Sequence, residues 1–235
     1  MNVAELKKKA AYTAVEREVH SGMKLGLGTG STVAYALDAL GEALHEGRIR
    51  DIVGIPTSQR TAERARELGI PLVELHEVEA LDVTIDGADE IDPHLELIKG
   101  LGGALLREKM ITQVTKRFVI IADERKLVQQ LGQKAPLPVE VVQFGWQAHL
   151  SFLKREGATP ILRERDGVPY LTDNGNYIID CHFDKETGIL DPHVLDQRLL
   201  GRAGIVDHGL FLHMAAIAYV AGKKEIITIR GKKRE

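Results

Sequence analysis

Cysteine is almost absent from this sequence, and its scarcity limits the possible chemistry. Cys181 is the one cysteine among 235 residues. A single thiol forms neither an internal disulfide nor a cysteine-rich zinc site, and the low count fits a reducing compartment. Aromatic residues make up only 5% of the chain, so the core must be built mainly from aliphatic side chains.

A charge excess and long apolar runs are absent as well. The 31 lysine and arginine residues are balanced by 34 aspartate and glutamate residues, which leaves no electropositive excess for a nucleic acid. No run of 18 apolar residues occurs, so we expect no transmembrane helix and no membrane partner. Charges at Glu5 and Lys7–Lys9 stand where a signal peptide would be apolar. We therefore expect a cytoplasmic protein.

The sequence does contain 23 glycines and an ordinary balance of 44% hydrophobic and 28% charged residues, as in folded globular proteins. Short apolar runs lead into turns, and helical patterns follow the turns. Strands are predicted at 23–27, 52–55, 72–75, 83–85, 95–98 and 118–122, and helices from 3 to about 20, near 33–40, at 59–68 and at 104–115. The repeated order of strand, turn and helix predicts an α/β fold.

The pattern changes near Gly132. Strands are predicted at 139–142 and 159–165, helices at 146–155 and 192–200, and hairpin turns at Asp166-Gly167 and Asn174-Gly175. Strand-like runs at 210–212, 216–220 and 226–229 predict a return to the first domain. We expect a larger domain of residues 1–131 plus 206–235 and a smaller α+β domain of residues 132–205.

The segment Gly26-Leu27-Gly28-Thr29-Gly30-Ser31-Thr32 is the first candidate site. A glycine turn before a helix exposes backbone N–H groups at the positive end of the helix dipole, which suits a phosphate. The alternative is an ordinary turn in which Ser31 or Thr32 caps the helix. A dinucleotide site is not favoured, because the third glycine of that motif is missing in both possible registers. A P-loop lysine is missing too.

The segment Asp86-Gly87-Ala88-Asp89-Glu90 is the second candidate. Carboxylates that follow an apolar strand lie where open α/β sheets bind their ligands. The alternative is a solvated acidic turn or a helix cap. Aspartates also bind magnesium, but a phosphate site without a nucleotide offers magnesium no obvious partner.

The third candidate combines Lys99-Gly100-Leu101-Gly102-Gly103 with Arg107-Glu108-Lys109. Three glycines in four positions allow a ligand to approach the backbone closely, beside one lysine. On a helix that starts near Ala104, Glu108 lies at the edge of the apolar stripe, where partial desolvation suits a general base. The alternative is a surface triplet without a catalytic role.

Two other chemistries lack support in the sequence. The nine histidines include no His-x-x-x-His pair, so we expect no metal site. No Gly-x-Ser-x-Gly segment occurs, which removes the usual starting point of a serine hydrolase.

Six segments occur along the chain in a fixed order: Gly28-Thr29-Gly30-Ser31-Thr32, Asp86-Gly87-Ala88-Asp89-Glu90, Lys99-Gly100-Leu101-Gly102-Gly103 with Arg107-Glu108-Lys109, Ile121-Ala122-Asp123 followed by Lys126, Pro136-Leu137-Pro138-Val139-Glu140-Val141, and Thr172-Asp173-Asn174-Gly175-Asn176. Together they closely resemble the type A ribose-5-phosphate isomerase family, over essentially the whole chain. Each segment alone would be a weak signal, whereas six with matching spacing are specific.

The resemblance implies an aldose–ketose isomerase that interconverts D-ribose 5-phosphate and D-ribulose 5-phosphate through an enediolate, in the non-oxidative branch of the pentose phosphate pathway. It implies that no cofactor is needed. It further implies a Rossmann-like, mostly parallel α/β sheet domain with a smaller inserted α+β (ferredoxin-like) domain, and a homodimer or homotetramer.

The resemblance also implies the site residues. Glu108 is the catalytic base, and Asp86, Asp89 and Lys99 complete the catalytic set. The positions that bind the sugar phosphate are Thr29, Gly30, Ser31, Thr32, Asp86, Gly87, Ala88, Asp89, Lys99, Gly100, Leu101, Gly102 and Lys126. Leu101 departs from the family, because some members have glycine there, but Lys99 and the backbone donors at Gly100 and Gly102 are retained.

Two other functions remain open at this point. One is a sugar-phosphate sensor of the same fold that binds without turnover, although such regulators need a helix-turn-helix and the first 20 residues hold only one helix pattern. The other is a transferase of the coenzyme A type with a glutamate nucleophile, for which the chain is short. Turnover of ribose 5-phosphate would separate all three functions.

Overall fold

The computed structural model describes residues 2–231, which fold as two compact units. The first unit comprises residues 2–88, 107–126 and 213–231, and the second comprises residues 89–106 and 127–212. These bounds differ from the predicted domains, because residues 89–106, 127–131 and 206–212 belong to the second unit. Three very short strands in these segments pair with one another: β4 (Glu90–Ile91), β5 (Leu97–Ile98) and β13 (Leu210–Phe211).

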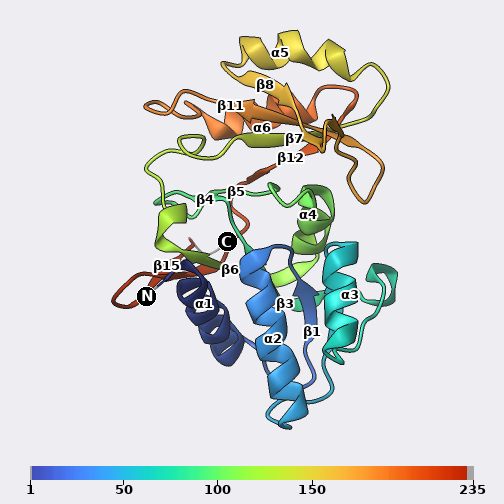
Figure 1. Cartoon of the computed structure of the whole chain (residues 1–235), viewed down its shortest axis with the longest axis vertical. Coiled ribbons are helices and arrows are strands. Elements are labelled where there is room, and N and C mark those ends of the chain that lie inside the picture. The colour runs from blue at the N-terminus through green and yellow to red at the C-terminus, as the bar shows by residue number, and fades with distance from the viewer. Residues whose placement is uncertain (1, 232–235) are drawn as a thin grey trace. The chain divides into compact units, whose positions relative to one another are not determined.

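A six-stranded sheet forms the centre of the first unit, in the order β15-β14-β6-β3-β1-β2 (Figure 1). Its strands are β1 (Lys24–Leu27), β2 (Val53–Pro56), β3 (Leu81–Gly87), β6 (Thr115–Asp123), β14 (Ile217–Ala221) and β15 (Ile226–Arg230). All neighbours pair in parallel except β14 and β15. The predicted mostly parallel sheet and the return of the C-terminal segment to it are confirmed.

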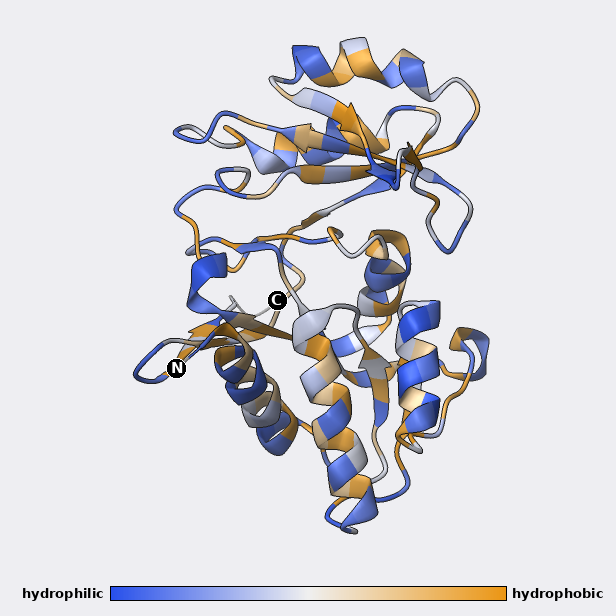
Figure 2. Ribbon diagram, in the orientation of Figure 1, coloured by the Kyte–Doolittle hydropathy of each residue, from blue (hydrophilic) through white to orange (hydrophobic). Residues whose placement is uncertain are grey.

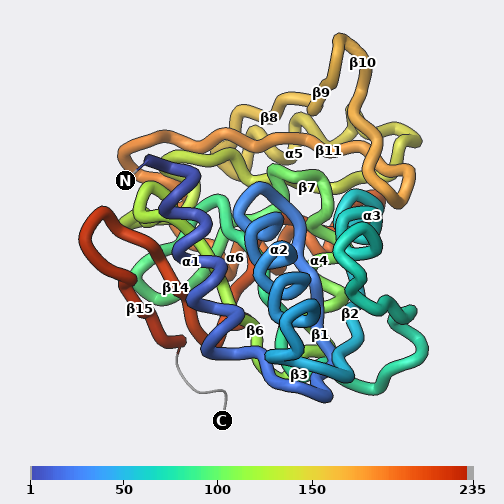
Figure 3. The backbone as a smooth tube through the Cα atoms, turned by 60° about the horizontal axis from the view of Figure 1, so that its bottom comes forward, coloured from blue at the N-terminus to red at the C-terminus, as the bar shows by residue number. Residues whose placement is uncertain are grey.

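The helices of the first unit cover this sheet. They are α1 (Val3–Glu18), α2 (Ser31–His45), α3 (Gln59–Glu67) and α4 (Leu105–Gln113), of which residues from Arg107 onward belong to this unit, and the 3-10 helices η1 (Leu75–Glu77) and η2 (Glu124–Lys126). Helices α1 and α2 lie side by side (Figures 1 and 3). Figure 2 shows both hydrophobic and hydrophilic residues along α2, as expected of a helix with one buried face.

Alternate residues of the strands pack against these helices. One apolar cluster contains Leu25 and Leu27 of β1, Val83 and Ile85 of β3, and Val119 of β6, together with buried residues of α1 and α2. Because strand side chains alternate between faces, the strict two-residue spacing places all of these side chains on one face of the sheet. The aliphatic core expected from the low aromatic content is confirmed.

The strand order creates a topological switch point. Strand β1 lies between β2 and β3, so the chain crosses to one side after β1 and to the other side after β2. In open α/β sheets, ligands bind beyond the carboxyl ends of the strands at such a point. The segments after β1, β3 and β6 lie at this edge, which positions Gly28–Thr32, Gly87-Ala88 and η2 together in the first unit.

The second unit has a four-stranded antiparallel sheet in the order β12-β7-β11-β8. Along the chain its elements are β7 (Leu137–Val141), η3 (Trp146–His149), α5 (Leu150–Arg155), β8 (Thr159–Leu162), the pair β9 (Glu164–Arg165) and β10 (Val168–Pro169), β11 (Tyr177–His182), α6 (Pro192–Leu200) and β12 (Ile205–His208). The order β7-α5-β8-β11-α6-β12 is the βαββαβ arrangement of ferredoxin-like domains, as predicted.

Local predictions were mostly, but not always, accurate. Asp166 and Gly167 both have positive φ angles in the turn between β9 and β10, which confirms that hairpin. The predicted strand at 72–75 is wrong, because it is reduced to one bridge between Gly54 and Leu72. There Glu74 and Glu77 cap each other's backbone and start η1 instead. Among residues 2–231, no helix is long and apolar enough to cross a bilayer.

Candidate active site

A glycine turn, Gly28–Thr32, connects β1 to α2. The N-cap of α2 is Gly30, whose φ of 127° is unfavourable for a residue with a Cβ atom, and no side chain caps the helix. Ser31 and Thr32 therefore lie in the first turn of α2 and do not cap it, contrary to the alternative considered above. The first N–H groups of a 15-residue helix remain open to an anion.

Lys7 adds a cation to this helix terminus. Its Nζ atom donates a hydrogen bond of 2.8 Å to Ser31 Oγ. The sequence prediction did not include Lys7, which lies on α1 between Leu6 and Lys8, at the edge of that helix's buried face. The helical spacing of α1 indicates which of its residues border the buried face. Only the packing of α1 against α2 shows that Ser31 is the hydrogen-bond partner of Lys7.

Thr29 is turned into the first unit. Its hydroxyl lies 2.7 Å from Thr57 Oγ1 and donates to Ser58 Oγ at 2.8 Å, and only 8% of Thr29 is exposed. Thr61 Oγ1 donates to the Gly28 carbonyl at 2.8 Å. This network of hydroxyls fixes the glycine turn to the residues that follow β2, so the Thr29 side chain stabilises the shape of the turn.

Asp86 ends β3 beside the same turn and is fully buried. Its Oδ1 atom accepts hydrogen bonds from the Thr29 N–H at 3.0 Å and the Gly87 N–H at 2.7 Å. A Cβ atom at Gly28 would lie 2.2 Å from Asp86 Oδ1, closer than any real contact. Glycine at position 28 is therefore what lets the carboxylate lie against the end of β1.

Glu108 lies on α4 and is only 2% exposed. Lys109 is buried as well, and Arg107 is partly buried. The alternative of a solvated Arg107-Glu108-Lys109 surface triplet is therefore wrong. A carboxylate shielded from bulk water in this way suits a base that must take a proton from carbon.

Lys126 belongs to η2, directly after β6. Burial alone would raise the pKa of the Asp123 carboxyl at the end of that strand, but hydrogen bonds from Arg125 hold this pKa below its ordinary value. Asp123 is therefore a carboxylate that anchors η2 through Arg125. Lys126 is half-buried at the edge where β1, β3 and β6 end.

The remaining predicted residues lie in the second unit. Lys99 follows β5, is 2% exposed, and its N–H donates to the Gly209 carbonyl at 2.9 Å. Its ammonium group lies 5.3 Å from the centre of the Phe211 ring, within the range of a cation–π contact. These contacts keep the Lys99 side chain in a defined place.

The side chains of Asp89 and Glu90 bind different parts of the second unit. Asp89 Oδ2 accepts a hydrogen bond of 2.9 Å from the Leu101 N–H, so it is fixed to the glycine loop, Lys99–Gly103. Glu90 is fully buried and accepts from the backbone N–H groups of Gly132, Lys134 and Ala135. The acidic segment is therefore not a solvated turn, and Glu90 stabilises the fold.

Two motifs without an assigned role meet in the second unit. Glu140 of β7 is fully buried, and its Oε1 atom accepts hydrogen bonds from Thr172 Oγ1 and Asn176 Nδ2, both at 2.9 Å. The buried Glu140 carboxylate thus joins the segments 136–141 and 172–176. It fixes the Asn174-Gly175 turn.

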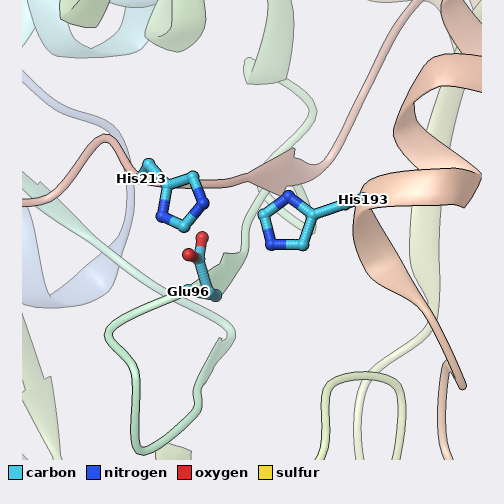
Figure 4. A group of neighbouring side chains, drawn as sticks. All are labelled: Glu96, His193 and His213. Atoms are coloured by element: carbon cyan, nitrogen blue, oxygen red, sulfur yellow. The ribbon is translucent and has the colours of Figure 1, made fainter.

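Glu96, His193 and Cys181 are reactive groups that the candidate site does not use. In the second unit, ligand atoms of Glu96 and His193 lie within 4.8 Å of each other (Figure 4), while His213 in the same view belongs to the first unit. No sequence spacing indicated this pair, because its members lie on segments almost 100 residues apart. Burial raises the pKa of the Cys181 thiol above its ordinary value, which makes it a poor nucleophile.

Comparisons with known proteins agree on one family. The sequence model of "Ribose 5-phosphate isomerase A (phosphoriboisomerase A)" matches residues 53–225. The "Ribose-5-phosphate isomerase A" of Roseiflexus castenholzii is 49% identical over 95% of this chain and 94% of its own. That of Chloroflexus aurantiacus is 52% identical over 93% of this chain and 90% of its own.

Solved structures give the same result. The ribose 5-phosphate isomerase of Plasmodium falciparum matches with a TM-score of 0.94 and 41% identity, over 98% of this chain and 100% of its own. A D-ribose-5-phosphate isomerase in complex with phospho-erythronic acid matches with a TM-score of 0.94 and 43% identity, over the same shares of the two chains.

Proposed function

The chain belongs to the ribose 5-phosphate isomerase A family, and on that premise we propose that it interconverts D-ribose 5-phosphate and D-ribulose 5-phosphate with Glu108 as the base. The reaction moves one proton between C1 and C2 of the open-chain sugar through an enediolate, so one carboxylate can remove the proton and return it. The observation that carries this assignment is the 2% exposure of Glu108.

The phosphate of the sugar is assigned to the glycine turn. The uncapped N-terminus of α2 offers backbone N–H groups and the positive end of the helix dipole. Ser31, Thr32 and the Lys7 ammonium group add donors, and Lys126 supplies a second cation after β6. In this assignment the Thr29 side chain stabilises the turn, and Gly30, Ser31 and Thr32 contact the phosphate.

The reacting end of the sugar is assigned to the acidic segment and the glycine loop. Asp86 and Asp89 accept and return hydroxyl protons during ring opening and enediol formation. Lys99 and the N–H groups of the glycine loop stabilise the oxyanion that develops at the carbonyl oxygen, since fixed donors of this kind lower the barrier. Gly87, Ala88, Gly100 and Leu101 contact the substrate through their backbone.

Turnover in the presence of EDTA tests this function. Purified protein is mixed with ribose 5-phosphate and EDTA, and formation of the ketose is followed. We expect turnover that EDTA does not reduce, because side chains and backbone supply every group the proposal uses. Binding of the sugar phosphate without turnover would instead support the sensor module and overturn the proposal.

Self-association and location belong to the same proposal. Exposed large apolar side chains of the described chain are mostly in the second unit, where Phe144 is 93% and Leu190 is 83% exposed, and such side chains often mark interfaces. We expect two or four copies of the 25.9 kDa chain to form the protein in solution, which light scattering would measure. The single cysteine supports a cytoplasmic location, which cell fractionation would test.

A further inference from the structure

Arg163 contacts the backbone of the glycine loop from a distant part of the second unit. It follows β8, and its Nη1 atom donates to the carbonyl oxygens of Gly100 at 3.0 Å and Leu101 at 3.3 Å. Its side chain is only 12% exposed. More than 60 residues of sequence separate the arginine from these carbonyls, so the contact is a tertiary one.

Asp180 of β11 fixes the guanidinium group. Arg163 Nε donates to Asp180 Oδ2 at 2.8 Å and Nη2 donates to Oδ1 at 2.5 Å. This two-point pairing sets the plane of the guanidinium, as is usual for arginine and a carboxylate. The ring of Tyr170 also lies near, 5.9 Å from the guanidinium carbon. The remaining donor edge of Arg163 is therefore held toward the loop.

The orientation of two carbonyl groups decides where two N–H groups point. In a trans peptide, the N–H of one residue points away from the carbonyl of the residue before it. Because the carbonyls of Gly100 and Leu101 face Arg163, the N–H groups of Leu101 and Gly102 point to the opposite side. The Leu101 N–H donates to Asp89 Oδ2, whereas the Gly102 N–H donates to no acceptor among residues 2–231.

The conformation of the loop depends on this support. Gly100 has a φ of 104°, and the Gly103 N–H donates to the Gly100 carbonyl at 3.0 Å. The side chain of Leu101 is 41% exposed and contributes little packing. Gly100 and Gly103 pack closely against Leu105 and Tyr170, and the hydrogen bonds to Arg163 and Asp89 fix the planes of the two peptides between these glycines.

We propose that Arg163, fixed by Asp180, is a positioning residue that orients the Gly102 N–H as a donor for the oxyanion formed during isomerisation. The inference rests on the proposed function, because that function gives the glycine loop its oxyanion role. Lysine cannot replace arginine here, since one ammonium group cannot hold both carboxylate oxygens and both carbonyls.

Arg163→Lys tests the inference with Arg165→Lys as its control, because Arg165 lies on the neighbouring β9 and is exposed. Loss of one oxyanion donor costs about 100- to 1,000-fold in kcat, so we expect a misoriented donor in Arg163→Lys to lower kcat about 10- to 100-fold, with a smaller change in KM. We expect Asp180→Asn to lower kcat in the same direction, and Arg165→Lys to leave it unchanged.

A pair of ligands separates positioning from a general structural role. Phospho-erythronic acid carries a carboxylate where the enediolate would carry its charge, whereas ribitol 5-phosphate carries only hydroxyls there. We expect Arg163→Lys to weaken binding of the acid about tenfold and to leave binding of ribitol 5-phosphate unchanged. Equal weakening of both ligands, or no loss of kcat, would overturn the inference.

Two further outcomes are decisive. If Arg163→Lys does not fold, as judged by its circular dichroism, the same kinetic and binding measurements on Asp180→Asn decide the matter. If the wild-type protein does not turn over ribose 5-phosphate, the proposed function fails, and the two-ligand comparison still shows whether Arg163 orients an anion donor.

Discussion

The glycine turn of the first unit and the glycine loop of the second unit have similar sequences but are stabilised in different ways. The turn is held by hydrogen bonds to residues at the ends of the neighbouring parallel strands, namely Asp86, Thr57 and Ser58. The loop is held by Arg163 and Asp180, which come from segments remote in sequence, and by Asp89. Both segments pack closely at a glycine, Gly28 against Asp86 and Gly103 against Tyr170, but only the loop also depends on a guanidinium group that is paired with a remote carboxylate.

This difference predicts different sensitivities. A segment fixed by close packing should fail when a single atom is added, because no neighbour can yield. A segment held by a guanidinium group should lose its conformation when lysine replaces the arginine, because lysine keeps the charge but not the arrangement of donors. Arg163→Lys probes the loop, and the substitutions below probe the turn and then the scaffolds of the two units.

Gly28→Ala should have the largest effect among these. The added Cβ would lie 2.2 Å from Asp86 Oδ1 and 2.7 Å from Asp86 Cα, so the carboxylate and the turn must both move. A misplacement near 1 Å can cost about 100-fold in rate, and we expect a loss of kcat of that order. Steady-state kinetics would measure it, and a wild-type kcat would contradict the packing argument.

Gly47→Ala is the matched control. Gly47 follows α2, has a φ of 70°, and has open space around its Cβ position. Because alanine is strained in this left-handed conformation, the substitution should lower the free energy of unfolding by about 1–2 kcal/mol. We expect no change in kcat. Urea unfolding followed by circular dichroism would measure that loss.

Lys7→Met should have the next largest effect. It removes the ammonium group that bonds to Ser31 at the start of α2 while keeping an apolar stem on α1. Hydrogen bonds to charged groups contribute about 1.5–3 kcal/mol, so KM for ribose 5-phosphate should rise about tenfold or more. Calorimetry should show weaker binding of inorganic phosphate. Lys8→Met, one residue away and exposed, should leave both values unchanged; equal effects would exclude a phosphate role for Lys7.

Thr172→Val should lower the stability of the protein and leave kcat unchanged. It removes the hydroxyl that donates to the buried Glu140 carboxylate, and we expect the free energy of unfolding to fall by about 1–3 kcal/mol. Urea titration would measure the change, with the exposed Thr159→Val on β8 as its control. A large loss of kcat with unchanged stability would show that this cluster takes part in the reaction.

Glu18→Gln should have the smallest effect, and it should depend on pH. Burial alone would raise the pKa of Glu18, but hydrogen bonds from Arg117 and Tyr219 lower it below its ordinary value. A carboxyl with a lowered folded-state pKa stabilises the fold above its unfolded-state pKa, and this contribution is lost as pH falls through the folded-state pKa.

We expect wild type to exceed Glu18→Gln in unfolding free energy by about 1 kcal/mol at pH 7, and the difference to shrink as pH drops below about 4. Urea unfolding across this pH range would measure it, with the exposed Glu63→Gln as control. A difference that grows toward acid pH would contradict the sign.

The two regions also differ in how well the sequence predicted them. The glycine turn and Asp86 are found where apolar strands end, and parallel strands bring such positions to one edge of a sheet. That reasoning proposed these two parts of the candidate site, whereas Lys126 was named only because the family resemblance implies it. It did not find Lys7, because the partner of a surface lysine depends on how two helices pack.

Contacts in the second unit were harder to predict. Neither Arg163 nor Asp180 lies in a recognisable motif, and the pairing that holds Arg163 against the loop depends on the register of β8 and β11. Glu90 was grouped with the aspartates because its backbone is adjacent, yet its side chain is used in the fold. The order of residues in the sequence indicated where the chain turns, but only the tertiary structure shows where the Glu90 side chain points.

Turnover by Glu108→Gln is the most direct test of the central claim, that Glu108 moves the proton. Glutamine keeps the size of the side chain and removes the base, and a general base contributes about 100- to 10,000-fold to the rate. We predict a loss of kcat in this range, with an unfolding transition like that of wild type and with full activity in Glu63→Gln. A folded Glu108→Gln protein with near-normal kcat would contradict the claim.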